Sequence, residues 1–183
     1  MSETNNIFRL GLPAPDFKLK GTTPDGSIAD YSLSEARGHW VVLFFYPKDF
    51  SYICPTEVKE FSYRFDEFDM VDAVVFGVST DSIESHVKWI NALGDIRYPL
   101  LSDSQYAASK AYGTFLPDES ISLRGTFIID PAGVLRYVLY HDNAIGRSVN
   151  ETLRVLSALR TGEMCPAEWQ PGEPTIGLQG DLP

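Results

Sequence analysis

The segment V-V-L-F-F-Y-P-K-D-F-S-Y-I-C-P-T-E, residues 41–57, joins an unbroken apolar run to a cysteine and a proline. Residues 41–46 are too few for a typical helix and are rich in β-branched and aromatic side chains, so they predict a strand buried on both faces. Pro55 suits the first position of a helix, because the N–H that it lacks would have no partner within the helix. The segment therefore predicts a central strand, a loop and a helix, with Cys54 at the start of the helix.

The residues that follow Cys54 continue this pattern. Val58, Phe61, Phe65 and Phe68 recur at helical spacing among polar and charged residues, which predicts an amphipathic helix that begins at or just after the cysteine. Residues 71–78 are again apolar and predict a second buried strand. A strand, a helix and a second strand in this order favour a parallel pair joined by a crossover helix.

Turn and capping signals place the other elements. They predict two hairpins, one within residues 16–32 around T-P-D-G and one of 126–129 with 134–140. They also predict a helical turn opened by Ser32 and Glu35 and a short helix over 103–112. Two longer helices are expected, one opened by Asp81 and Glu84 that ends at Gly94, and one opened by Ser148 and Glu151 that ends at Gly162. The pattern is an α/β fold with a mixed sheet and helices on both faces. We expect residues 1–183 to form one domain, with 162–183, rich in Pro and Gly, as an extended, exposed C-terminal arm.

Composition excludes several classes of partner. The 183 residues carry 15 Lys and Arg against 25 Asp and Glu, a net charge of −10 at pH 7, and no run of basic residues. A surface that binds nucleic acid or an anionic membrane needs such a run, so we expect neither partner. We see no signal-peptide pattern and no apolar stretch long enough to span a bilayer, so we expect a soluble, cytoplasmic protein.

Cys54 is the candidate for chemistry. A sulfur at a helix N-terminus faces unpaired N–H groups and the positive end of the helix dipole, which favour the nucleophilic thiolate. Ser51 could offer a hydroxyl to the sulfur or to a substrate, Pro47 could form one wall of a pocket, and Glu57 could orient an arginine from elsewhere in the chain. The alternative is that Cys54 is a small, inert core residue, as free cysteines often are.

Nothing in the sequence indicates a metal or a cofactor. His39, His86 and His141 are scattered, with no carboxylate or cysteine at the spacing of metal ligands, so each is expected to be an ordinary surface or core histidine. No Gly-rich phosphate loop is present either. We therefore expect chemistry carried by side chains.

The segment P-K-D-F-S-Y-I-C-P-T-E closely resembles the active-site segment of the peroxiredoxins, specifically the typical two-cysteine subfamily that includes the bacterial alkyl hydroperoxide reductase peroxidase subunit. The likeness continues through V-S-T-D, P-L-L-S-D, R-G-T-F-I-I-D-P, G-R-S and G-E-M-C-P-A-E-W, and so covers nearly the whole chain. It implies a thioredoxin-like fold and a thiol-dependent peroxidase that reduces hydrogen peroxide and small organic hydroperoxides.

The resemblance also implies a role for individual residues. Cys54 matches the peroxidatic cysteine, whose thiolate attacks the O–O bond and becomes a sulfenic acid. Pro47 matches the pocket proline, and Arg124 resembles the arginine beside the sulfur. Glu57 and Arg147 resemble the polar network that orients this arginine. Ser51 departs from the family, which usually has Thr there, so the hydroxyl is kept but the methyl that limits its rotamers is lost.

Cys165 corresponds to the family's resolving cysteine, which attacks the sulfenic acid on a partner subunit. The resemblance thus implies an intersubunit disulfide, a homodimer and a ring of five dimers. The disulfide would be reduced by a thioredoxin or a flavoprotein reductase, because the chain has no C-x-x-C pair. The alternatives are that Cys165 is an incidental surface thiol, and that the protein acts as a peroxide sensor or a ring-forming holdase chaperone. A general thiol–disulfide carrier would normally keep its cysteines close together.

Overall fold

A computed structural model describes residues 9–178. The chain divides into two compact units, residues 1–147 and 148–183, and each is described separately. Within the described residues, no helix is long and apolar enough to cross a membrane. The expectation that residues 1–183 form one domain, with an arm from residue 162, stays a prediction.

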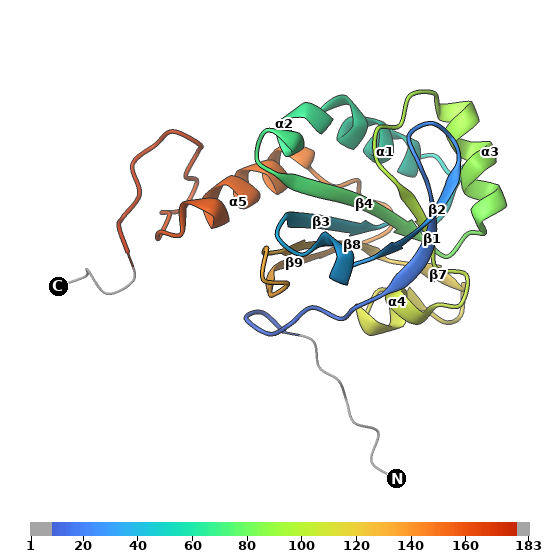
Figure 1. The fold of residues 1–183 in the computed structure, drawn as a ribbon, viewed down its shortest axis with the longest axis horizontal. Helices are drawn as coiled ribbons and strands as arrows, with labels where there is room; N and C mark the ends of the chain where they lie inside the picture. The colour runs from blue at the N-terminus through green and yellow to red at the C-terminus, as the bar shows by residue number, and fades with distance from the viewer. Residues whose placement is uncertain (1–8, 179–183) are drawn as a thin grey trace, which may run out of the picture. The chain divides into compact units, whose positions relative to one another are not determined.

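A mixed, seven-stranded sheet with the strand order β2-β1-β5-β4-β3-β8-β9 forms the first unit (Figure 1). The strands are β1 (Lys18–Thr22), β2 (Ile28–Ser32), β3 (Trp40–Phe45), β4 (Ala73–Ser79), β5 (Leu100–Ser102), β8 (Arg124–Ile129) and β9 (Leu135–His141), while β6 (Phe115–Leu116) and β7 (Ile121–Ser122) form a separate small ribbon. β3 pairs in parallel with β4 and antiparallel with β8. The predicted central strand, parallel pair and two hairpins are confirmed.

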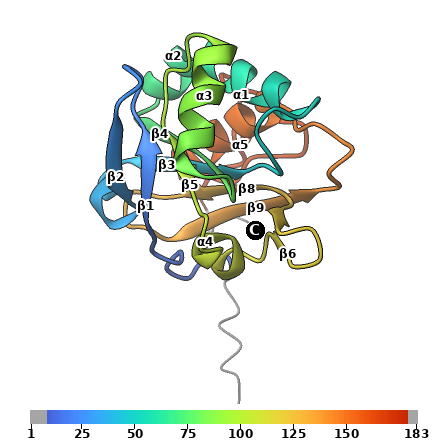
Figure 2. The same cartoon turned by 90° about the vertical axis from the view of Figure 1, so that its right-hand side faces the viewer.

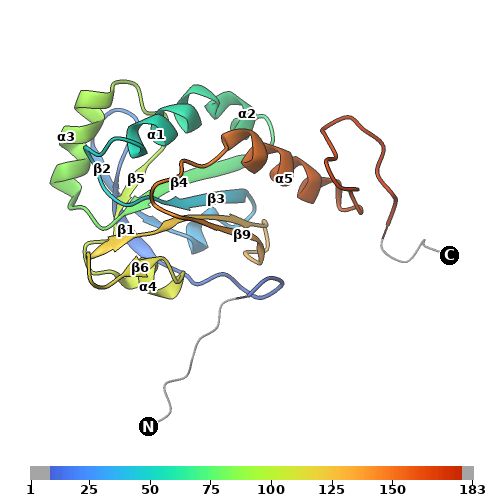
Figure 3. The ribbon, with the colours of Figure 1, turned by 180° about the vertical axis from the view of Figure 1, so that it is seen from behind.

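Helices cover both faces of the sheet, as predicted. α1 (Cys54–Tyr63), α2 (Phe65–Asp69) and α3 (Ile83–Leu93) lie on one face, and α4 (Ala107–Ala111) lies on the other (Figures 2 and 3). The short 3-10 helix η1 (Ser34–Ala36) lies between β2 and β3. β3 is buried on both faces because it runs through the middle of these layers.

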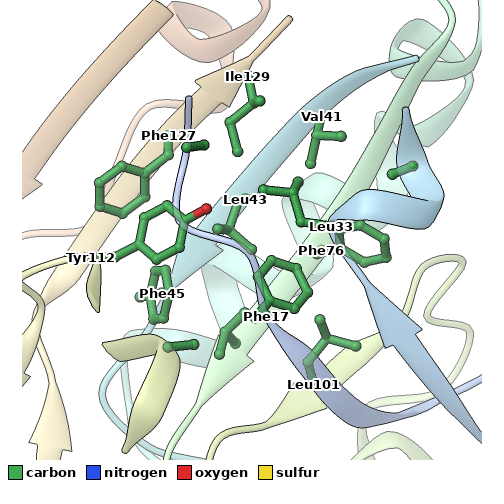
Figure 4. Packing of buried hydrophobic residues seen from close by; sticks show 14 of the residues in the cluster. Phe17, Leu33, Val41, Leu43, Phe45, Phe76, Leu101, Tyr112, Phe127 and Ile129 are labelled. Carbon is green, nitrogen blue, oxygen red and sulfur yellow. The ribbon is translucent and has the colours of Figure 1, made fainter. Parts of the chain in front are cut away.

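The alternation of β3 builds two aromatic cores. Val41, Leu43 and Phe45 point into the cluster on the α4 face, where Tyr112 and Phe127 pack against Phe45 (Figure 4). On the opposite face, the ring of Phe44 stacks on that of Phe61 with 4.3 Å between centroids. The second core therefore packs α1 against the sheet and fixes the position of the helix start at Cys54.

Three predicted helix starts are wrong in detail. Ser82, not Asp81, caps α3 by accepting from Ser85 N. The Asp81 carboxylate instead accepts from Ser79 Oγ and from the main-chain N–H of Asp49. Ser32 does not cap η1, because Asp16 accepts from Ser34 N instead. α4 is shorter than the predicted span of 103–112, because the side chain of Asp103 binds the main chain at its start.

The amphipathic helix after Cys54 is interrupted. At Arg64 the backbone leaves the helical region, with ψ at 15°, so that α1 ends and α2 begins. Val58, Phe61 and Phe68 are nonetheless fully buried, as their spacing predicts. The break changes the direction of the chain without removing the apolar face.

The second unit contains α5 (Val149–Thr161). Ser148 accepts from Glu151 N at its start, and Gly162, with φ at 69°, ends it, so the predicted cap and stop are confirmed. The segment that follows is not extended throughout: Met164 and Gly177 form an antiparallel bridge, and Trp169 is buried.

Candidate active site

Cys54 is the first residue of α1, and its side chain is fully buried. Pro55 therefore occupies the second helical position, one later than predicted. The preceding Ile53 gives no side-chain cap, Pro55 has no N–H, and the N–H of Thr56 donates to the carbonyl of Ile53 at 2.9 Å. The local sequence thus places a thiol at the positive pole of a helix.

Arg124 reaches the sulfur from β8. The pairing of Phe44 with Thr126 puts alternate residues of β8, Arg124 included, on the sheet face that carries α1. Its Nη1 donates to Cys54 Sγ at 3.3 Å, and its Nε donates to the carbonyl of Asn143 at 3.1 Å. The predicted strand began at residue 126, but β8 starts at Arg124, which fixes this side chain through regular sheet geometry.

Glu57 joins two arginines. Its Oε2 accepts from Arg124 Nη1 at 2.5 Å, and its Oε1 accepts from the main chain and Nε of Arg147 at 2.8 and 2.9 Å. Arg147 also donates to the carbonyls of Phe45 and Gly125, at 2.6 and 3.0 Å. The structure therefore brings together four of the predicted residues, Cys54, Glu57, Arg124 and Arg147.

The charges of this cluster are unbalanced. Glu57, Arg124 and Arg147 are all buried, and their hydrogen bonds join two guanidinium groups to one carboxylate. Burial lowers the pKa of Arg147 from its usual value, and the nearby Glu57 opposes this effect. Negative charge that develops on Cys54 or on a bound substrate would make the cluster neutral.

Ser51 and Pro47 lie in the loop between β3 and α1. Pro47, two residues after the end of β3, is buried, and Ser51 is half-buried. The hydroxyl of Ser51 donates to the carbonyl of Lys48 at 3.0 Å, so its single proton is already used. The Ser51 hydroxyl thus binds the main chain of its own loop. Among the hydrogen bonds of residues 9–178, none joins Ser51 to Cys54.

Cys165 lies in the second unit, and its surroundings are the reverse of those of Cys54. It is half-buried, beyond the C-terminus of α5, and its Sγ lies 3.9 Å from the carbonyl oxygens of Ala158 and Glu163. Carbonyl oxygens and the negative end of a helix disfavour a thiolate. Both cysteines are free thiols in the structure.

Sequence reasoning missed two features near the site. The first is Asn143, whose side chain accepts from the main-chain N–H of Arg124 at 3.2 Å and whose carbonyl accepts from the Arg124 guanidinium. Asn143 lies in a loop, where the sequence pattern gave no signal for this contact. The second is a buried pair, His86 with Asp49 of the Cys54 loop, at 2.8 Å. His86 is thus a core histidine, but its partner was not predicted.

The remaining histidines and the acidic residues form no evident metal centre. His39 makes an exposed pair with Asp72 at 2.7 Å. Among residues 9–178, no group of three His, Cys, Asp or Glu side chains is arranged to hold a metal ion.

Comparisons with known proteins agree with this geometry. The family model described as "AhpC/TSA family" matches residues 10–138. The chain is 46% identical to "Peroxiredoxin prdx-2" of Caenorhabditis elegans, over 91% of this chain and 88% of that protein, and 45% identical to "Peroxiredoxin-1" of Gallus gallus, over 91% and 89%.

Solved structures give the same result. A reduced 2-Cys peroxiredoxin of Plasmodium vivax superposes with a TM-score of 0.88 at 36% identity, over 91% of both chains. AhpC of Enterococcus faecalis gives 0.83 at 28% identity, over 87% of this chain and all of that one. The thioredoxin-like fold expected from the sequence is confirmed by these neighbours.

Proposed function

Because the chain belongs to the AhpC/TSA family of peroxiredoxins and is a thiol-dependent peroxidase, an oxidoreductase, we propose that Cys54 attacks the peroxide and that Cys165 resolves the product. The observation that carries the assignment is the 3.3 Å contact between Arg124 Nη1 and Cys54 Sγ inside a buried cluster with one excess positive charge. The peroxiredoxin relatives favour this activity over a peroxide sensor or a holdase.

In the first step, the Cys54 thiolate attacks the terminal oxygen of the peroxide. An S–O bond forms, the O–O bond breaks, and the leaving alkoxide or hydroxide takes a proton to give an alcohol or water. Arg124 has a fixed fork of N–H donors next to the sulfur, so it can bind the peroxide oxygens as negative charge develops on them. Glu57 and Arg147 hold that fork in place. Pro47 and Ser51 belong to the loop that precedes Cys54, where Ser51 binds the carbonyl of Lys48.

In the second step, the thiol of Cys165 on a partner subunit attacks the sulfenic sulfur. An S–S bond forms and water leaves. A thioredoxin or a flavoprotein reductase then reduces this disulfide to two thiols by thiol–disulfide exchange. Hydrogen peroxide and small organic hydroperoxides are the proposed substrates, and the need for reduced thiols supports the cytoplasm as the site of action.

We propose a homodimer that assembles into a ring of five dimers. Two surfaces support association: the sheet ends in the edge strands β2 and β9, and the Cys54 loop exposes Phe50 and Tyr52, the latter at 99%. Analytical ultracentrifugation of the reduced protein tests this. A species of ten chains supports the ring, and a monomer at all concentrations would contradict even the dimer.

The relay is tested with one equivalent of hydrogen peroxide and a non-reducing gel. Wild type should form a covalent dimer, while Cys54→Ser and Cys165→Ser should not. Mass spectrometry of the Cys165→Ser variant should find a sulfenic acid on Cys54. If the wild type loses both free thiols but stays monomeric, the disulfide forms within one chain. If it loses no free thiol, Cys54 is an inert core cysteine.

A further inference from the structure

A second buried polar pair, Asp49 with His86, holds the other end of the loop that carries Cys54. Asp49 and His86 are both buried, and Asp49 Oδ2 lies 2.8 Å from His86 Nδ1. The second ring nitrogen, Nε2, lies 3.1 Å from the carbonyl oxygen of Leu101 in β5. Both ring nitrogens therefore lie within hydrogen-bond distance of an oxygen, one in Asp49 and one in the main chain of Leu101.

The carboxylate of Asp49 is fully engaged. Its Oδ1 accepts from the hydroxyl of Tyr46 at 3.0 Å, and its Oδ2 also accepts from Ser85 Oγ at 2.8 Å. Burial and the nearby Asp49 raise the pKa of Tyr46 well above its usual value, so this hydroxyl stays a donor. The main-chain N–H of Asp49 donates to Asp81 at 3.0 Å. The loop is thereby tied to α3 and to the end of β4.

This network is separate from the one around the sulfur. Glu57, bound by Arg124 and Arg147, holds the segment after Cys54, whereas Asp49, bound by His86, holds the segment before it. Between the two anchors, Phe50 adopts a φ of 53°, a conformation that costs a non-glycine residue free energy. The Asp49 anchor thus holds a strained loop closed.

Closure matters because the Cys54 side chain is not exposed at all. Its sulfenic acid has two fates. A thiol from another subunit can attack it, which forms S–S and releases water, but only after the loop and the first turn of α1 open. A second peroxide can instead convert it to the sulfinic acid and release an alcohol or water, a step that does not need a second protein chain to reach the sulfur.

We propose that His86 is a positioning residue of the peroxidase reaction: its ring holds Asp49 and so sets how often the loop opens to present oxidised Cys54 for disulfide formation. This inference rests on the proposed function. It predicts that loss of His86 moves the partition of the sulfenic acid toward the disulfide and away from the sulfinic acid.

The test compares His86→Asn with wild type in two separate steps. Rapid mixing with peroxide gives the rate of Cys54 oxidation, and the later covalent dimer gives the rate of resolution. Loss of a buried hydrogen-bonded anchor typically changes an equilibrium, here that between the closed and the open loop, by ~5- to 100-fold. We therefore expect disulfide formation with Cys165 to be faster by about that factor and the fraction of sulfinic acid to fall in parallel. Oxidation itself should change far less. Ser85→Ala, a milder change at the same carboxylate, should shift the partition in the same direction but less.

Two controls separate positioning from general loss of stability. His39→Asn removes a histidine from an exposed pair with Asp72, where the side chains are 50% and 67% exposed, and should leave the partition unchanged. Ile90→Ala creates a cavity on the same helix without touching Asp49, and should lower the melting temperature without favouring the disulfide.

The inference is overturned if His86→Asn and Ile90→Ala shift the partition equally, or if His86→Asn leaves the partition unchanged. In that case wild type still forms its disulfide and the proposed function stands. A wild type whose Cys54 does not react with peroxide at all would instead refute the proposed function, and the inference with it.

Discussion

Arg147 donates twice to one oxygen of Glu57, from its main-chain N at 2.8 Å and from its Nε at 2.9 Å, across 90 positions of sequence. The contact joins the loop after β9 to the first turns of α1. Because Glu57 also binds Arg124, one carboxylate balances two buried guanidinium groups and connects both to the helix that carries Cys54.

Glu57→Gln is expected to destabilise the fold. Removing one partner of a buried ion pair leaves an uncompensated charge, so the free energy of unfolding should fall by ~3–5 kcal/mol in urea titrations at fixed protein concentration. The matched control is Glu67→Gln, which breaks the half-exposed pair with Arg64 and should cost under about 1 kcal/mol. Equal losses in the two variants would contradict the central role of Glu57.

Arg124→Lys is expected to slow the oxidation of Cys54 by about 10²- to 10³-fold, since it removes a preorganised donor from the site where charge develops. A lysine keeps the charge but not the fork that binds Cys54 and Asn143 together. The rate is measured by stopped-flow fluorescence. Arg136→Lys, on the neighbouring β9 and paired with the carboxylate of Asp130, is the control and should react like wild type.

Ser51→Thr should react at least as fast as wild type, because the added methyl restricts the rotamers of the hydroxyl. Ser51→Ala loses the bond to Lys48, worth about 0.5–1.5 kcal/mol, and should oxidise more slowly because the loop is held less firmly. Both are measured as second-order rates with hydrogen peroxide. If the alanine variant reacts as fast as wild type, the Ser51 hydroxyl has no part in the reaction.

Gly125→Ala should disturb β8 directly beside Arg124. A Cβ there would lie 2.7 Å from Thr114 Cγ2 and 2.9 Å from the Phe127 ring, so overpacking should cost ~1–3 kcal/mol of stability. Gly146→Ala is the control, because its Cβ would meet Ile53 at an ordinary 3.4 Å. Thermal unfolding of both variants tests the difference, and an equally stable Gly125→Ala would show that the strand can move to make room.

Cys165 should be a poor peroxidase. In the Cys54→Ser variant it should consume peroxide no faster than a small free thiol, because its sulfur faces carbonyl oxygens at the end of α5 and has no arginine contact such as the one at Cys54. A peroxide electrode measures the rate, with free cysteine as reference. Rapid turnover by this variant would reverse the two roles.

Local patterns in the sequence predicted much of this protein correctly. The run at residues 41–46 indicated the buried central strand, Ser148 and Gly162 bounded α5, and the motif around Cys54 indicated a thiol at a helix start. Such features depend on neighbours within a few residues, so they can be read from the chain in order. The resemblance of the motif to the peroxiredoxins then gave the identities of Arg124, Glu57 and Arg147.

Competition for hydrogen bonds was settled in three dimensions. Asp81 could cap α3 by spacing, but it binds Asp49 and Ser79, and Ser82 caps the helix instead. The contacts of Asn143 with Arg124 and of His86 with Asp49 join segments that the chain keeps far apart. Sequence spacing thus predicted most of the elements and the thiol at a helix start, while the packing of the fold determined which buried polar groups meet, because a buried polar group takes whichever partner the fold brings within reach.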